Sequence, residues 1–183
     1  KHVAGSNAVG GGPDEQEKKL SSRQRRKATE TTALGLHPGA PAIADGVDKT
    51  SQASLDTVMS FMGAMGGGDM DTVAALMHND MVWQNEGDKA MPWIGPWNGK
   101  EEIFAFLGVF SKNLETTFWE TEEAFASGDT VAIFGRMKTK LTKSGVETTP
   151  FTFALRAKVQ AGQVILWNWF EDSYAVSQAF HAK

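Results

Sequence analysis

The sequence predicts one α+β domain at residues 53–183, and the order of its periodic segments is the reason. Two segments with helical periodicity come first, and a third helix follows one short strand. Four strand-like segments, separated by short turns that contain glycine, complete the domain. Helices followed by a run of neighbouring strands pack on one face of a sheet. Residues 1–52 are expected to form a flexible N-terminal arm or linker.

The arm has a composition unlike that of the domain. It contains a GGGP stretch, a basic run from Lys18 to Lys27 and the segment LHPGAPAIADG. Such a segment offers little apolar surface to offset the entropy lost on ordering the chain. Because acidic residues precede and follow the basic run, we interpret it as a solvated helix or tail. The alternative is a patch that binds phosphate groups or an anionic membrane.

Composition limits the class of protein. Of the 183 residues 41% are apolar, and 6 Trp and 11 Phe against 1 Tyr predict an aromatic core. The domain itself is acidic, so no nucleic-acid partner is expected. Four scattered histidines and no cysteine predict neither a metal site nor thiolate chemistry. No apolar run is long enough to span a membrane, and a cytoplasmic location is expected.

The first two helices are predicted from their periodicity and caps. Apolar residues recur at intervals of three and four after Ser54, at Leu55, Val58, Met59, Met62 and Met65. The glycines at 66–68 end this helix, and Asp69 caps a second helix that ends near Asn79. Together they form an αα-hairpin.

The rest of the domain follows in order. MVWQNE is predicted to be a strand, MPWIGPW an irregular segment, and Lys100 to Asn113 a helix. Strands are predicted at about 115–126, 129–141, 146–160 and 163–171, because SGD, KSG and AGQ turns separate them. The segment DSYAVSQAFH is predicted to be a short helix, capped by Asp172 or Ser173.

This element order resembles the NTF2-like superfamily, in particular its ketosteroid-isomerase-like or SnoaL-like branch and its limonene-epoxide-hydrolase-like branch. Three strings carry the resemblance: SFMGAMGGGDMDTVAALMHNDMVWQN, PWIGPWNGKEEI and GQVILWNWFEDSYAV. The resemblance implies a cone, in which a curved, mostly antiparallel sheet wraps around helices and encloses a pocket. It also implies a homodimer formed through the outer face of the sheet.

The epoxide-hydrolase branch implies site residues at matching positions. Its Tyr-x-Asn, which holds the attacking water, is matched by Trp83 and Asn85. Its Arg-x-Asp is matched by Arg136, with Lys138 in place of the acid. Trp169 stands where the last relay carboxylate is expected. The resemblance thus retains Asn85 and Arg136 of that pattern.

The isomerase branch implies a carboxylate base on the first strand and an acid that donates to an oxyanion. The matching strand position is near Gln84, and Phe153 or Leu155 stands where the donor is expected.

Because strand side chains alternate, each strand has one set that faces the pocket. The register that the resemblance implies gives the inward sets as Trp167, Trp169 and Glu171, then Phe151, Phe153 and Leu155, then Phe134, Arg136 and Lys138. Helix residues close the pocket, namely Met62, Met65, Leu107 and Phe110. A large apolar cavity with a few polar groups is typical of a small-molecule site.

A buried Arg136 requires a partner, because an unpaired buried guanidinium costs several kcal/mol. The candidates are Glu120, Glu122, Glu171 or an anionic ligand. An ion pair without a catalytic role is the alternative to a ligand clamp. Likewise, Trp83, Trp93 and Trp97 either stack on a ligand or pack in the core or at a dimer interface.

The leading hypothesis is a cofactor-independent enzyme that acts on a small apolar molecule, as an epoxide hydrolase or a ketosteroid isomerase does. The predicted catalytic residues are Asn85, Gln84 and Arg136. The predicted substrate-binding residues are Trp83, Trp93, Trp97, Met62, Met65, Phe153, Trp167 and Trp169. One alternative is a noncatalytic binding module. Another is a dimerisation unit, with outward residues such as Trp119, Thr121, Met137 and Asn168 at its interface.

Overall fold

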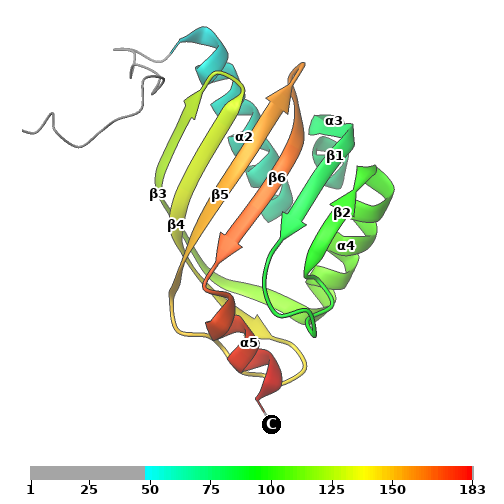
Figure 1. Cartoon of the computed structure of the whole chain (residues 1–183), viewed down its shortest axis with the longest axis vertical. Coiled ribbons are helices and arrows are strands. Elements are labelled where there is room, and N and C mark those ends of the chain that lie inside the picture. Colours follow the sequence, from blue (N-terminus) through cyan, green and yellow to red (C-terminus); the bar gives the residue numbers. More distant parts are fainter. Residues whose placement is uncertain (1–47, 183) are drawn as a thin grey trace, which may run out of the picture. The chain divides into compact units, whose positions relative to one another are not determined.

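The structure, a computed structural model, describes residues 48–182 and confirms the α+β class (Figure 1). The basic run at 18–27 and the rest of the predicted arm up to residue 47 lie outside the described residues. In chain order the elements are α2 (Lys49–Gly67), α3 (Met70–Leu76), β1 (Met77–Asn85), β2 (Gly95–Asn98), α4 (Gly99–Asn113), β3 (Leu114–Ser127), β4 (Thr130–Leu141), β5 (Phe151–Gln160), β6 (Gln163–Glu171) and α5 (Ser173–His181).

The strands form one curved, unclosed sheet in the order β2-β1-β6-β5-β4-β3. Only β1 and β6 are parallel, so the sheet is mostly antiparallel, as predicted. Helices α2 and α4 lie against the same face, which we call the inner face (Figure 1). None of the helices within residues 48–182 is both long and apolar enough to cross a membrane.

Helix α2 begins earlier than its apolar periodicity predicts. Asp48 caps it by accepting from the Ser51 backbone N–H over 2.8 Å, and Ser51 is itself buried. The Ser51 hydroxyl accepts a hydrogen bond from the Gly128 N–H in the turn between β3 and β4. Polar side chains therefore make the first contacts of this helix with the sheet, and an apolar pattern does not reveal them.

The segment predicted to be irregular, residues 91–97, overlaps the short strand β2. It pairs with β1 so that Trp97 lies opposite Trp83. A proline in a strand is tolerated at an edge, because its missing N–H then faces away from the neighbouring strand. Since β2 is the edge strand of the sheet, Pro96 does not prevent it from forming.

The predicted inward set of β4 is wrong by one residue. The buried residues are the odd-numbered ones, Val131, Ile133, Gly135, Met137, Thr139 and Leu141, so Phe134, Arg136 and Lys138 face outward. Gly135 hides the alternation because it is an inward residue without a side chain. A Cβ there would lie 2.1 Å from the Glu120 carbonyl oxygen and 2.6 Å from Phe153 Cζ. The inward set of β5 is confirmed, since Phe151, Phe153 and Leu155 are all buried.

Strand β3 has register shifts between Thr116 and Phe118 and between Thr121 and Glu123. Such bulges bend a strand and increase its twist. They also change the alternation, so that Trp119 and Thr121 lie opposite Met137 and Gly135, which are inward residues of β4, and their predicted outward orientation is wrong. Trp119 is nevertheless 39% exposed. The outward prediction for Met137 is wrong because the inward set of β4 is shifted by one residue. Trp119 stacks on the buried Phe153, with ring centroids 4.4 Å apart, and Met137, opposite Trp119, is buried.

Candidate functional site

Asn85 lies on the inner face at the end of β1 and is buried. Its side-chain oxygen accepts from Trp83 Nε1 over 2.9 Å, and its side-chain nitrogen donates to the Trp93 carbonyl oxygen over 3.1 Å. Both ends of the amide are therefore bonded to the protein. In this structure Asn85 orients Trp83 and holds the 86–94 loop against β1.

The predicted tryptophans form an aromatic core. Trp83 contacts Phe106 of α4 and Trp167 of β6, with centroid distances of 5.1 Å in both pairs. Trp93 meets Phe180 edge-on at 5.6 Å, and Trp97 stacks on Phe106 at 5.3 Å. The Nε1 atoms of Trp97 and Trp167 have no hydrogen-bond partner among the described residues. The half-buried Met62 and Met65 pack against this core from α2.

A carboxyl group lies beside three stacked rings farther along the same face. Phe153 stacks on Trp169 at 4.8 Å with an interplanar angle of 17°, and Trp119 covers Phe153 from β3. Trp169 Nε1 donates to Glu171 Oε2 over 2.9 Å, and Glu171 lies opposite Phe153 in the sheet. We call these four residues the Glu171 cluster.

Glu171 is half-buried, and its burial among these side chains raises the pKa of its carboxyl group above the ordinary value of 4.5. The hydrogen bond from Trp169 opposes that rise, and the neighbouring charge of Asp172 adds to it. A carboxyl group whose pKa is raised by burial among apolar side chains is a typical proton donor or acceptor in an active site.

The structure does not bring the three predicted catalytic residues together. Gln84 lies next to Asn85 in β1 and so points to the opposite, outer face, where its amide is 3.4 Å from the Glu86 carboxylate. Arg136 is exposed on the same outer face, between Glu120 and Thr152 on the neighbouring strands. Of the three, only Asn85 is on the inner face.

Glu171 was predicted to face inward, but only as a possible partner of Arg136. Its spacing of two from Trp169 and four from Trp167 was the signal that it shares their face. The rings of Trp119 and Phe153 lie near Glu171 because of the register of β3 and β5, which the sequence pattern of β6 alone does not reveal.

Within residues 48–182, no group of three or more His, Asp or Glu side chains is arranged to hold a metal ion.

Comparison with known proteins gives one family match. The sequence model of the SnoaL-like domain matches residues 58–167. A comparison with curated proteins found no match.

Several solved structures share the fold. An NTF2-like protein from Burkholderia xenovorans has 23% identity and a TM-score of 0.67, over 74% of this chain and 100% of its own. A protein from Jannaschia assigned as a SnoaL-like polyketide cyclase has 20% identity and a TM-score of 0.64, over 76% and 99%. TerC, co-crystallised with polyporic acid, has 18% identity and a TM-score of 0.63, over 71% and 99%. At these identities the likeness concerns the fold.

Proposed function

The chain belongs to the SnoaL-like family, and from this premise we propose that it is a cofactor-independent enzyme that acts on a small apolar molecule. In this proposal the molecule binds on the inner face of the sheet, beside the tryptophans. Glu171 transfers the proton.

The observation that carries the proposal is the Glu171 cluster. A carboxyl group with a raised pKa holds its proton to a higher pH than an exposed glutamate does, can donate it to a carbonyl or epoxide oxygen, and can take up another from carbon or water. The rings of Trp119, Phe153 and Trp169 offer planar surfaces on which an unsaturated or ring-containing molecule can stack. The site therefore favours a planar, apolar substrate with one oxygen to be protonated.

Neither Asn85 nor Arg136 is placed to act as the matching residues of the epoxide hydrolases do. The Asn85 amide already bonds Trp83 and Trp93, and Arg136 lies on the outer face. A water held by Asn85 and a relay through Arg136 therefore have no support in this geometry. Acid–base chemistry at an oxygen next to Glu171 needs neither residue, and isomerisation or ring closure is the better-supported reaction class.

The test is a screen of cyclic ketones, ketosteroids and epoxides, in which deuterium uptake from solvent and product formation are followed by NMR. Glu171→Gln keeps the shape of the side chain but removes the ionisable group. Glu120→Gln makes the same change at an exposed site on the outer face of β3. We expect turnover by the wild type and by Glu120→Gln, and a loss of about a hundredfold or more in Glu171→Gln. Equal turnover by all three proteins would refute the proposal.

A noncatalytic binding module is the second candidate. It is favoured by Lys138 and Trp169, which stand where relay acids are expected, and by the engaged amide of Asn85. Polyporic acid, the ligand crystallised with TerC, is a suitable first probe for tryptophan fluorescence titration. Tight binding of this and related compounds without any turnover in the screen would favour the module over the enzyme.

We also propose that the protein is a homodimer. The outer face of the sheet exposes the aromatic side chains of Phe125, Phe134 and Phe170, and Phe125 and Phe134 stack at 6.0 Å. Exposed apolar groups gathered on one face favour association. Analytical ultracentrifugation tests the homodimer, because a monomer at micromolar concentration would contradict this proposal.

A further inference from the structure

Helix α5 has two distinct faces. Ser173, Ser177 and His181 recur at intervals of four and share one side of the helix. Val176 and Ala179 are buried on another side, and Phe180 packs against the core next to them. The polar side meets the 86–94 loop, which connects β1 to β2.

Asp88 of that loop holds the polar side of α5. Ser177 Oγ donates to Asp88 Oδ2 over 2.7 Å, and His181 Nε2 lies 2.8 Å from the same oxygen. The other oxygen, Oδ1, accepts from the Ala90 N–H over 2.9 Å. Ser177 and His181 both bond the Asp88 carboxylate and do not bond each other. The three residues therefore connect α5 to the loop and are not arranged as a nucleophilic triad.

The loop also approaches the first turn of α5. Gly87 has a φ of 149°, and a Cβ added to it would lie 3.1 Å from Ser173 Cβ. The loop thus contacts α5 at its beginning through Gly87 and at its end through Asp88.

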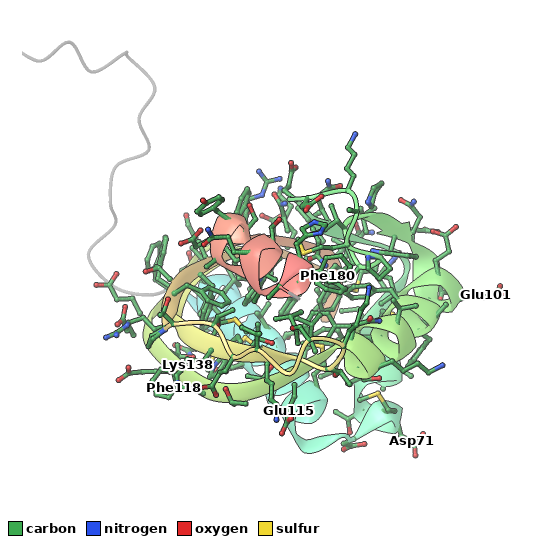
Figure 2. All side chains as sticks on the ribbon, turned by 90° about the horizontal axis from the view of Figure 1, so that it is seen from below. Asp71, Glu101, Glu115, Phe118, Lys138 and Phe180 are labelled. Atoms are coloured by element: carbon green, nitrogen blue, oxygen red, sulfur yellow. The ribbon has the colours of Figure 1, made fainter. Side chains whose placement is uncertain are left out.

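Helix α5 lies at the end of the domain where β6 ends, next to Glu171 of the cluster (Figure 1). It begins directly after Glu171, with Asp172 as its cap. Phe180 meets Trp93 edge-on at 5.6 Å, and the Ala179 carbonyl accepts from Ser144 Oγ over 2.9 Å. Figure 2, which views the domain from this end, shows α5 with Phe180 in front of the side chains of the interior.

A helix of nine residues is marginal without tertiary contacts, and α5 buries few large side chains. Segments of this kind open locally at a lower free energy than that of global unfolding. We propose that α5 is a lid over the Glu171 cluster, that it opens about Asp172, and that Asp88 is its latch. The lid itself is independent of the proposed function. Only the assumption that a ligand binds beneath the lid depends on the proposed function.

The first test measures the lid without any ligand. Asp88→Asn keeps an oxygen for the Ala90 N–H but replaces the one that Ser177 and His181 bond. Asp80→Asn is the control, because Asp80 is exposed on β1. By hydrogen exchange and mass spectrometry, we expect α5 to exchange roughly tenfold to a hundredfold faster in Asp88→Asn, with β4 and β5 unchanged. If α5 exchanges only together with β4 and β5 in every variant, the lid is refuted.

The second test asks whether the lid controls access. Binding of anilinonaphthalene sulfonate, followed by stopped-flow fluorescence, should be about tenfold faster in Asp88→Asn than in the wild type or Asp80→Asn. An unchanged association rate in a variant whose α5 exchanges faster would show that α5 does not gate the site, and would overturn the proposal. Neither readout depends on catalysis. If Glu171 has no catalytic role, the hydrogen-exchange and dye-binding results therefore still test the lid.

Discussion

The indole N–H of Trp169 donates to the carboxyl group of Glu171 over 2.9 Å, between residues two apart on one face of β6. This bond links the aromatic stack on the inner face to its acidic group. It stabilises the charged form of the carboxyl group and so lowers its pKa, whereas burial raises that pKa. The two effects oppose each other, so the Glu171 pKa depends on both.

Replacing Trp169 by Phe should raise the pKa of Glu171 further. The substitution removes a hydrogen bond to the carboxylate, while Phe still stacks on Phe153. A carbon NMR titration of the glutamate side chains measures this shift. Asn168→Ala, at the neighbouring outward position of β6, is the control and should leave the Glu171 titration unchanged. A fall in the Glu171 pKa in Trp169→Phe would contradict the assigned role of the bond.

Glu171 should make the wild type less stable as the pH rises. Because its folded pKa is raised, its stabilising contribution is complete below 4.5 and is lost as the pH rises through the folded pKa. The free energy of unfolding of Glu171→Gln minus that of the wild type should therefore increase above pH 4.5. Urea unfolding across this range measures the difference, and a difference that does not vary with pH would count against the assignment.

Asp88 has the opposite pH dependence. Hydrogen bonds from the Ala90 N–H, Ser177 and His181 lower its pKa from 3.8 to about 2. Its contribution to stability is therefore present above pH 3.8 and is lost as the pH falls through about 2. The stability advantage of the wild type over Asp88→Asn in thermal unfolding should disappear across this interval. If the wild type is still more stable than Asp88→Asn at about pH 2, the ionised Asp88 carboxylate is not the cause of the difference in stability.

Asn85→Ala should destabilise the domain by about 1–3 kcal/mol, because the buried Trp83 N–H and Trp93 C=O would lose their partner. Urea unfolding measures the loss. Gln84→Ala, one residue away on the outer face, should change the stability by less than about 0.5 kcal/mol. Equal effects of the two substitutions would contradict the orientation of β1.

Gly135→Ala should destabilise the domain by about 1–3 kcal/mol, because the new methyl group would overlap the Glu120 carbonyl and the Phe153 ring. Gly63→Ala, in the middle of α2 with nothing within 4 Å of the added Cβ, should instead stabilise it by about 0.5–1 kcal/mol. Thermal unfolding distinguishes the two. If Gly135→Ala does not change the stability, β3 and β4 are not as closely paired as described.

The elements could be predicted from the sequence because their signals are local. Asp69 and Asp172 cap the helices at which they were expected, and β3, β4 and β5 each end near a predicted turn. The inward set of β5 followed from plain alternation of Phe151, Phe153 and Leu155. Helix α2 began before its apolar pattern, because Ser51 rather than an apolar residue makes its first contact.

The site was harder to predict, because it depends on register between strands. Gly135 removes the inward side chain in the middle of β4, which left Arg136 as the apparent inward group. The bulges of β3 turn Trp119 inward, and no local sequence signal fixes their positions. Gln84 and Asn85 are consecutive in one strand, so alternation alone already forbids that both face the same pocket.

The most direct test of the central claim is the titration of Glu171 itself in the wild type, with its carbon NMR signal assigned by its absence in Glu171→Gln. The account predicts a midpoint above 4.5, so that the carboxyl group retains its proton into the range where exposed glutamates are ionised. A midpoint at or below 4.5 would contradict the account, because Glu171 would then be an ordinary carboxylate without the property that qualifies it as the acid–base group.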